Sequence, residues 1–161
     1  NYLEIGSAMG ATARSVLDAG ITATCVDNWS QNIQPQDGAF ELAGNDKELF
    51  IKNTKGLPVT VVDHDLLTAT ISGKFDLVFY DGPHDKETTS NAVQHYAQNF
   101  ADTVVIIFDD ANWDGVVQGA AHGISQTDYT PILTKMVLNN VEDSTKWWNG
   151  LYIMVATKND T

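Results

Sequence analysis

The sequence is poor in cysteine and in long apolar runs. Its single cysteine, Cys25, lies in the apolar stretch ITATCV, so the chain can form no internal disulfide. We expect a buried structural thiol and, by default, a reducing cytoplasm. No apolar run approaches the roughly 18–20 residues of a membrane span. No secretory signal precedes the opening NYLEI, so we expect no membrane partner.

Basic residues are also scarce. Lys and Arg together number 9 of 161 residues, and the formal net charge is −12. Cationic contacts with phosphates dominate affinity for nucleic acids, so this charge argues against DNA or RNA as a partner. It is compatible with a small-molecule substrate, a cationic ligand or a metal ion. Homo-oligomer formation is left open by the sequence.

The length and the apolar content suit one folded domain. Hydrophobic residues make up 43% of the chain, enough for a real core. We therefore expect a single domain over residues 1–161. The sequence opens directly on a strand pattern and not on Met, which leaves open a fragment that lacks an N-terminal cap over the site.

Short β-rich runs alternate with helical patterns along the chain. Strands are predicted at 2–5, 21–27, 58–63, 75–81, 103–110, 131–138 and 150–157. Helices are predicted after the first, fourth and fifth strands and over 38–53, with Asp85 as a cap and Gly20 as a stop. Runs such as LVFY and TVVIIF are typical of parallel strands covered on both faces. The alternation predicts a doubly wound α/β domain that ends in an antiparallel hairpin.

Ligands of such sheets bind beyond the carboxyl ends of the strands. These ends fall at 6–10, 27–31, 63–66, 81–85 and 109–113, and the loop 139–149 joins them if strand six is parallel. Gly6 and Gly10 allow a tight turn that a ligand can approach closely, although their spacing is not G-x-G-x-x-G. Asp27 can accept hydrogen bonds from both hydroxyls of a ribose, and Trp29 can form a wall for an adenine. A packing turn, a cap and a core aromatic are the alternatives.

Three segments carry a family resemblance. In order and spacing, LEIGSAMGATARSVL, CVDNW and FDLVFYDGPH resemble the class I S-adenosylmethionine-dependent methyltransferases over nearly the whole chain. The likeness is greatest to the small-molecule branch with a DG-x-H fourth motif. The acidic pair after strand five resembles metal-dependent O-methyltransferases. The expected fold is a Rossmann-like, mostly parallel seven-stranded sheet of order 3-2-1-4-5-7-6 with an antiparallel last strand, and the expected reaction is methyl transfer to an oxygen of a small molecule or sugar.

The resemblance also implies residues that hold S-adenosylmethionine. They are Glu4, Gly6, Ser7 and Gly10 for the methionine part, Asp27, Asn28 and Trp29 for the ribose and its surroundings, and His64, Asp65 and Leu66 near the adenine. Asp63 competes with Asp65, because the sequence DHD leaves the register uncertain by two residues. Asp81 is expected to line both the cofactor and the acceptor sites.

Acidic residues end two strands that should be neighbours. Asp81, Asp109 and Asp110 would converge there together with Asn112. Uncompensated carboxylates repel each other and raise each other's pKa, whereas Mg²⁺ or a similar hard cation with oxygen ligands relieves the repulsion. Metal-dependent members of the family use comparable positions, so we expect a divalent metal site at these four residues. The alternative is an acidic strand end without metal, in which Asp109 or Asp110 caps the next helix.

The expected catalytic residues are Asp81, His84 and Asp110. Methylation of an oxygen requires that the acceptor lose its proton, either to a base or with help from a metal that lowers its pKa. His84, with an ordinary pKa near 6.5, is the natural base unless it only bonds locally at a helix start. Some metal-dependent O-methyltransferases act on antibiotic sugars and favour an acid two residues after the metal-binding Asp. This sequence differs from them, because Pro83 occupies that position.

Two other functions stay open on the sequence. One is an NAD(P)-dependent oxidoreductase, against which the absence of G-x-G-x-x-G counts. The other is a cofactor-binding module without catalysis.

Several further residues carry weaker expectations. Trp113 is predicted to line the acceptor pocket, while Trp147 and Trp148 form either an aromatic rim or edge packing. Structural or surface roles are expected for His95 and His122. Close helix–sheet packing is expected for a set of glycines that repeats every four residues, namely Gly115, Gly119 and Gly123.

Overall fold

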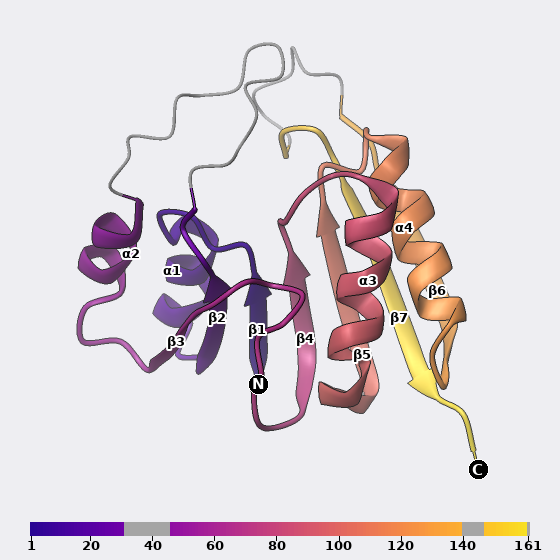
Figure 1. Cartoon of the computed structure of the whole chain (residues 1–161), viewed down its shortest axis with the longest axis horizontal. Helices are drawn as coiled ribbons and strands as arrows, with labels where there is room; N and C mark the ends of the chain where they lie inside the picture. The colour runs from indigo at the N-terminus through magenta and orange to yellow at the C-terminus, as the bar shows by residue number, and fades with distance from the viewer. Residues whose placement is uncertain (31–45, 140–146, 161) are drawn as a thin grey trace.

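The computed structural model in Figure 1 describes residues 1–30, 46–139 and 147–160. Its elements in chain order are β1 (Tyr2–Ile5), α1 (Ala11–Asp18), β2 (Ala23–Asp27), α2 (Asp46–Thr54), β3 (Val59–Asp63), β4 (Phe75–Tyr80), α3 (Lys86–Tyr96), the 3-10 turn η1 (Ala97–Asn99), β5 (Phe100–Asp109), α4 (Asp114–Ser125), β6 (Tyr129–Val137) and β7 (Leu151–Lys158). Residues 38–45 of the predicted helix 38–53 lie outside the described residues, and 46–53 fall in α2 as predicted. Most of the loop 139–149 also lies outside them.

The seven strands form one sheet of order β3-β2-β1-β4-β5-β7-β6, so the predicted order is confirmed. Strands β1 to β5 pair in parallel, whereas β7 is antiparallel to both β5 and β6. Two antiparallel pairings return β6 to the direction of β5. The carboxyl ends of β1 to β6 therefore meet at the same edge of the sheet, as the parallel arrangement requires.

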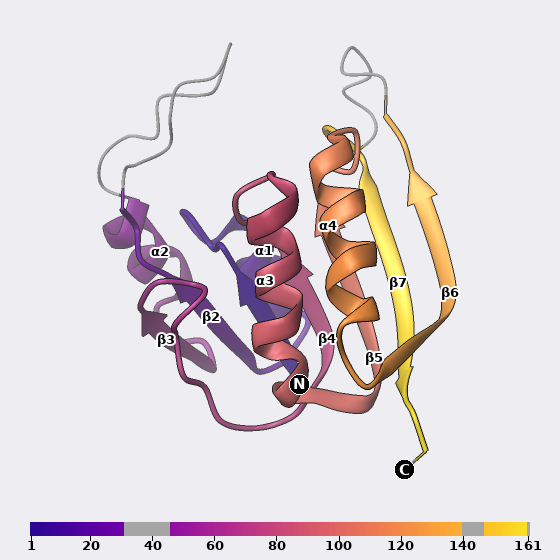
Figure 2. The same cartoon turned by 45° about the vertical axis from the view of Figure 1, so that its right-hand side comes forward.

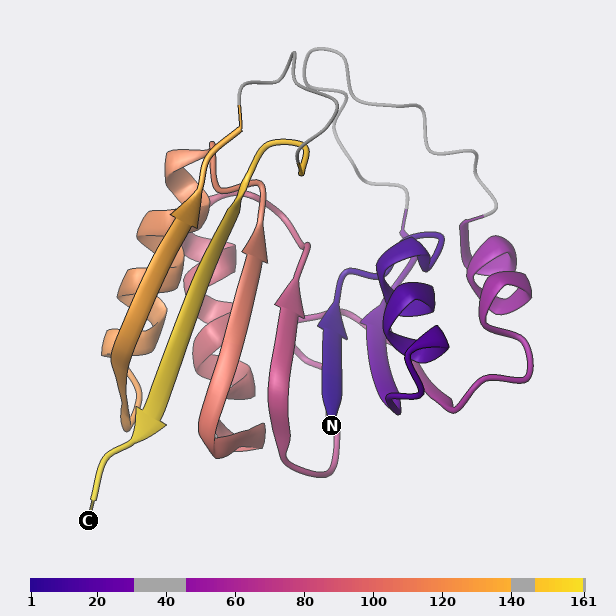
Figure 3. The same cartoon turned by 180° about the vertical axis from the view of Figure 1, so that it is seen from behind.

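Helices cover both faces of the sheet. Figure 2 shows α3 and α4 side by side over one face, and Figure 3 shows α1 and α2 on the other face beside β1 and β2. The larger apolar core lies under α3 and α4 and includes Val78, Tyr96 and Phe108, each at most 2% exposed. Cys25 is fully buried under α1, as expected.

Helix ends follow the predicted signals. Asp85 is the N-cap of α3, where its side chain accepts a hydrogen bond from the backbone N–H of Thr88. Gly20 lies just after α1 with a φ of +81°, the left-handed conformation that ends helices. Strand β5 begins three residues earlier than predicted, because η1 delivers the chain directly to Phe100. No helix of the described residues is long and apolar enough to cross a membrane.

The glycines of α4 pack against helix α3. The predicted close packing is present, but the prediction that the sheet is their partner was wrong. A Cβ at Gly119 would lie 2.6 Å from both the Lys86 carbonyl oxygen and the Thr89 Cβ, and one at Gly123 would lie 2.8 Å from the Ser90 carbonyl oxygen. All three of these residues belong to α3. Sheet packing was expected because periodicity gives the face of a helix but not its neighbour. The close approach of α3 and α4 fixes the loop between β4 and α3, which carries His84.

Candidate active site

The loop after β1 needs glycine at both predicted positions. Gly6 and Gly10 have φ values of +83° and +78°, a conformation that other residues rarely adopt. A Cβ at Gly6 would lie 2.1 Å from the Asp81 carbonyl oxygen, and one at Gly10 would lie 2.7 Å from the Phe50 ring. The first loop therefore passes directly against the end of β4. This contact brings the predicted cofactor loop and Asp81 together.

Asp27, at the end of β2, is held by backbone N–H groups. One carboxylate oxygen, Oδ2, accepts from Ser7 and Ala8, each at 2.8 Å, and the other, Oδ1, accepts from Trp29 at 2.8 Å. The indole N–H of Trp29 donates to the Ala8 carbonyl at 2.8 Å, and its ring packs on Phe50. Asn28 is exposed, and its side-chain oxygen accepts from the Ser30 backbone N–H at 3.0 Å.

The end of β3 carries the residues predicted near the adenine. The Asp65 carboxylate accepts from the Leu67 backbone N–H at 2.9 Å and so shapes the turn there. His64 is exposed beside it, and the Leu66 carbonyl accepts from the Tyr96 hydroxyl at 2.7 Å. Asp63, the competing candidate, is ion-paired with Lys47 of α2. Asp65 is thus bonded within its own turn, whereas the charge of Asp63 is paired with a lysine of α2.

Glu4 is a charged residue inside β1, and only 1% of it is exposed. Its carboxylate accepts from the Tyr2 hydroxyl at 2.5 Å. Burial raises the pKa of Glu4 to about 7, while the hydrogen bond from the Tyr2 hydroxyl opposes the shift. The Ser7 hydroxyl is itself buried beneath the loop without a hydrogen bond of good geometry. A buried acid and a buried hydroxyl thus lie under the glycine loop.

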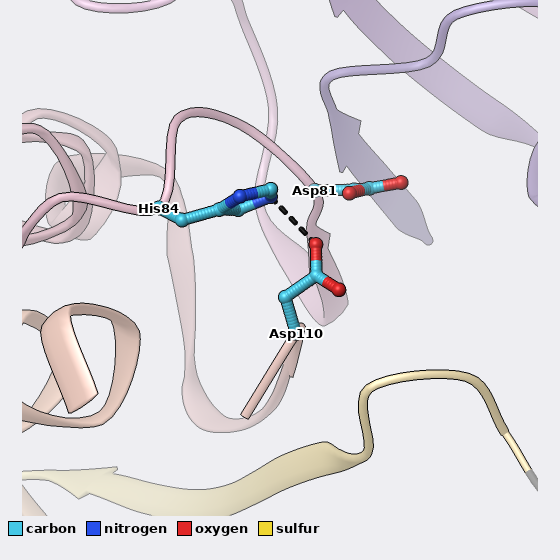
Figure 4. A group of neighbouring side chains, drawn as sticks. All are labelled: Asp81, His84 and Asp110. Atoms are coloured by element: carbon cyan, nitrogen blue, oxygen red, sulfur yellow. Dashed lines mark ion pairs between the residues drawn. The ribbon is translucent and has the colours of Figure 1, made fainter. Parts of the chain in front are cut away.

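Three side chains converge at the ends of β4 and β5. Figure 4 shows the His84 ring and the Asp110 carboxylate facing each other, with the Asp81 side chain beside them and directed away from His84. One potential ligand atom from each of the three residues lies within 4.8 Å of the others. His84 Nε2 lies 2.6 Å from Asp110 Oδ2. Asp110 is buried at 5% exposure and has a φ of +57°, so the chain turns sharply at the end of β5 and brings this carboxylate to His84.

Burial and the closeness of several carboxylates raise the pKa values of the residues in this cluster. Enclosure by the protein, followed by the negative charges of Asp109 and Asp110, raises the pKa of Asp81 to about 7, although its side chain keeps contact with solvent. The hydrogen bond to Asp110 raises the pKa of His84. Burial raises the pKa of Asp109 to about 6. The cluster therefore holds protons near neutral pH, and a bound cation would displace them.

Two of the predicted metal ligands have other partners. Asp109 Oδ1 accepts from the Trp147 indole N–H and from the Asp110 backbone N–H, both at 2.7 Å. The Asn112 side-chain amide donates to the Asn139 carbonyl at 2.5 Å, toward the end of β6. The structure instead groups Asp81 and Asp110 with His84, which the sequence predicted as a base. Only the DG-x-H spacing indicated His84, and nothing in the sequence indicated its pairing with Asp110.

Tryptophans lie on two sides of the acidic residues. The Trp113 ring lies 5.4 Å from the His84 ring and is 44% exposed. Trp147 contacts Asp109 and meets the Phe79 ring edge-on at 6.1 Å. His95 and His122 lie elsewhere, bonded to the Ala69 carbonyl and the Ser90 hydroxyl, which agrees with their structural assignment. Trp147, for which the sequence left open an aromatic rim or edge packing, both packs on Phe79 and donates to Asp109.

The loops that follow β1, β2, β4 and β5 lie along one edge of the sheet and carry two kinds of polar groups. Backbone N–H groups, glycines and a buried acid lie at the end of β1, and titratable side chains lie at the ends of β4 and β5. A sheet of this order and direction is the class I methyltransferase fold. A family model described as a methyltransferase domain matches residues 3–111, and the chain belongs to that family.

Solved structures agree on the fold. The N-methyltransferase NodS from Bradyrhizobium japonicum WM9, in complex with S-adenosylhomocysteine, has a TM-score of 0.64 at 15% identity, with 99% of this chain and 78% of that chain covered. Magnesium protoporphyrin IX methyltransferase from Synechocystis PCC 6803, with bound S-adenosylmethionine, has a TM-score of 0.60 at 16% identity, with 98% and 69% covered. A search of curated protein sequences gave no match. At these identities the likeness concerns the fold alone.

Proposed function

We propose that this protein transfers a methyl group from S-adenosylmethionine to an oxygen of a small molecule. The observation that carries the proposal is the contact between the glycine loop and Asp81, since a Cβ at Gly6 would lie 2.1 Å from the Asp81 carbonyl oxygen. This contact brings the loop after β1 and the acidic residues after β4 and β5 next to each other. A cofactor on the loop would then present its reactive end to the cluster of Asp81, His84 and Asp110.

The residues at the first loop fit the cofactor. The positive φ values of Gly6 and Gly10 leave the loop without side chains where a ligand would lie. Glu4 and Ser7, buried beneath it, offer polar groups for the methionine part, and Asp27, bonded to the same loop, would accept from the ribose. Asp65, with His64 and Leu66, would border the adenine. A negative edge also suits the positive charge that S-adenosylmethionine carries.

The cluster fits removal of a proton from the acceptor. His84, paired with Asp110 at 2.6 Å, takes the proton from the acceptor hydroxyl while Asp110 holds the ring in place. When bound, the cofactor supplies the methyl group: a bond forms from the acceptor oxygen to the methyl carbon as the bond from sulfur to that carbon breaks. Because its pKa is raised above 6.5, the His84 ring loses its own proton at a higher pH than an ordinary histidine, and only the neutral ring can take the acceptor proton. Trp113 and Trp147 would line the acceptor.

A divalent cation is the alternative to His84 as base, because an ion on Asp81, His84 and Asp110 would replace the bond between His84 and Asp110. Asp81, His84 and Asp110 each offer a ligand atom within 4.8 Å of the others. Two carboxylates and one imidazole suit Mn²⁺ or another transition metal at least as well as Mg²⁺. Such an ion would stabilise the acceptor oxygen as its proton leaves. The nearby Asp109 and Asn112 remain predicted ligands only if their present hydrogen bonds open.

Cofactor binding is tested first by thermal shift of the folded protein with S-adenosylhomocysteine or with NAD⁺. We expect S-adenosylhomocysteine to raise the melting temperature and NAD⁺ to leave it unchanged. A response to NAD⁺ alone would support an oxidoreductase. Binding of S-adenosylhomocysteine without turnover of any hydroxylated acceptor in a screen would support a module without catalysis.

Metal binding is tested by calorimetric titration of Mg²⁺ and Mn²⁺. We expect wild type to bind Mn²⁺, the variant Asp110→Asn to lose it, and Asp102→Asn to behave as wild type. Asp102 is a suitable control because it is exposed at the start of β5, at the other edge of the sheet. Equal titration curves for all three proteins would rule out a metal at the cluster.

A further inference from the structure

A groove between α3 and α4, the two helices that lie side by side in Figure 2, is separate from the candidate active site. Its volume is about 300 Å³, at the small end of the range of roughly 300–1,000 Å³ that is usual for small-molecule sites. Its lining consists of polar residues, namely Lys86, Glu87, Ser90, Asn91, Gln94 and His122. None of them belongs to the cluster at the ends of β4 and β5.

The groove is formed by one face of α3 and the closest part of α4. Lys86, Ser90 and Gln94 follow each other at intervals of four residues, which places them on the same face of the helix. Gly123 of α4 packs against the Ser90 carbonyl, and His122 directly precedes this glycine. Because the helices approach so closely, the His122 ring nitrogen Nδ1 lies 2.9 Å from the Ser90 hydroxyl.

A chain of hydrogen bonds determines which nitrogen of His122 carries the proton. The Gln94 amide nitrogen donates to the Ser90 carbonyl at 3.3 Å and to Ser90 Oγ at 3.0 Å, so the hydroxyl oxygen accepts there. The hydroxyl hydrogen is therefore donated to His122 Nδ1, and a neutral ring that accepts at Nδ1 carries its proton on Nε2. Ser90 is buried, whereas His122 is exposed. The buried hydroxyl thus selects the form of His122 that offers an N–H donor at Nε2.

Two opposite charges line the same groove. Lys86 and Glu87 are both exposed, and neither forms an ion pair within the described part of the chain. Residues next to each other in a helix do not face each other, so these two side chains do not satisfy each other's charge. The groove therefore offers an ammonium group and an imidazole N–H as donors, and a carboxylate as acceptor.

We propose that this groove binds a small zwitterion such as a free α-amino acid. The ligand carboxylate accepts from Lys86 and His122, and the ligand ammonium donates to Glu87. A ligand without net charge also suits a chain whose formal net charge is −12, since that charge repels a simple anion. This binding goes beyond methyl transfer and does not depend on it.

NMR titration of the protein with L-alanine, propionate and ethylamine tests the class of ligand. Propionate lacks the amino group of alanine, and ethylamine lacks its carboxylate. We expect L-alanine to shift the His122 ring signals with a dissociation constant in the millimolar range. Each of the other two should bind at least about fivefold more weakly, because it makes only one of the two charged contacts. Equal affinity for propionate and L-alanine would contradict the zwitterion, and no shift with L-alanine would overturn the site.

Substitutions in the groove test which residues hold the ligand. Lys86→Gln and Glu87→Gln each remove one charge, so each should weaken L-alanine binding by about fivefold or more. Ser90→Ala keeps both charges and removes the hydroxyl that selects the His122 tautomer, so we expect a loss of about twofold and a change in the ring ¹⁵N shifts. Lys52→Gln is the matched control, because Lys52 is exposed on α2, over the other face of the sheet (Figure 3), and no change is expected. Wild-type affinity in both charge variants would rule out the groove, whatever the result with S-adenosylhomocysteine.

Discussion

The two halves of the site hold their acids in opposite ways. In the cofactor half, formed by the loop 6–10 and Asp27, three backbone N–H groups satisfy the carboxylate. In the acceptor half, formed by Asp81, His84 and Asp110, carboxylates lie together with His84 as their nearest partner of opposite charge. In the first half, the carboxylate already has its hydrogen-bond donors. The second stores a charge imbalance that a proton, a substrate or a cation can relieve.

This difference predicts that the two halves contribute to the free energy of unfolding with opposite signs. Hydrogen bonds from N–H groups to a carboxylate are strong and contribute to folding, so the cofactor half should stabilise the protein. Crowded carboxylates that share protons near pH 7 cost stability once they ionise, so the acceptor half should destabilise it. Substitutions of acids in the two halves should therefore have effects of opposite sign.

The largest effect is expected where the halves touch. Gly6→Ala would place a Cβ 2.1 Å from the Asp81 carbonyl oxygen and would also strain a φ of +83°, so we expect a loss of roughly 3 kcal/mol or more in urea denaturation. Gly56→Ala is the matched control, since it has a φ of +79° and nothing within 4 Å of its Cβ position. It should lose only about 1 kcal/mol. Similar losses for the two would show that the halves are not in close contact.

The next effect belongs to the cofactor half. Asp27→Asn removes an acceptor that backbone N–H groups share, and we expect the free energy of unfolding to fall by about 2 kcal/mol at both pH 5.5 and pH 8. Urea denaturation at the two pH values measures it. A gain of stability at either pH would contradict the conclusion that Asp27 stabilises the loop 6–10 through its hydrogen bonds.

The acceptor half should respond in the other direction. Asp81→Asn removes a carboxylate whose pKa is raised to about 7, so the variant should be more stable than wild type at pH 8 by about 1 kcal/mol, a value reduced for its contact with solvent. The gain should shrink as the pH falls below 7 and vanish only near pH 3.8, where Asp81 is protonated in the folded and the unfolded protein alike. A loss of stability at pH 8 would mean that Asp81 has a stabilising partner.

The smallest expected effect is the pH slope of stability without ligands. Unfolded Glu4 releases its proton near pH 4.5, whereas the folded protein retains it to about pH 7, so the folded state binds more protons between these values and stability falls as the pH rises. Raised pKa values at Asp81, Asp109 and His84 act in the same direction. Denaturation at pH 5 to 8 should show this fall, and Glu4→Gln should flatten it. A profile that rises with pH would contradict the assignment.

Much of the fold was predictable from the sequence. Apolar runs such as LVFY mark strands buried on both faces, and β1 was placed without error at residues 2–5. The order of the strands followed from the family resemblance. The partner of the α4 glycines could not be predicted, because a four-residue spacing shows that a face is small but not whether a helix or a sheet lies against it.

The site was predictable in composition and less so in pairing. Residue types at strand ends located Asp81, Asp110 and His84 at one edge, since parallel strands end together. The bond from His84 to Asp110 depends on the left-handed turn at Asp110, for which the sequence gives no signal. Likewise, the three N–H groups on Asp27 come from backbone directions in two loops. Hydrogen bonds that depend on loop conformation could not be predicted from the sequence.

The central claim is that one edge holds both the cofactor and the acceptor chemistry. A crystal structure of the protein with S-adenosylhomocysteine and Mn²⁺ tests it most directly. We expect the sulfur to lie between the Gly6 loop and Asp81, with the ribose at Asp27 and the metal on Asp81, His84 and Asp110. Cofactor bound elsewhere, or bound here with its sulfur directed away from Asp81, would contradict it.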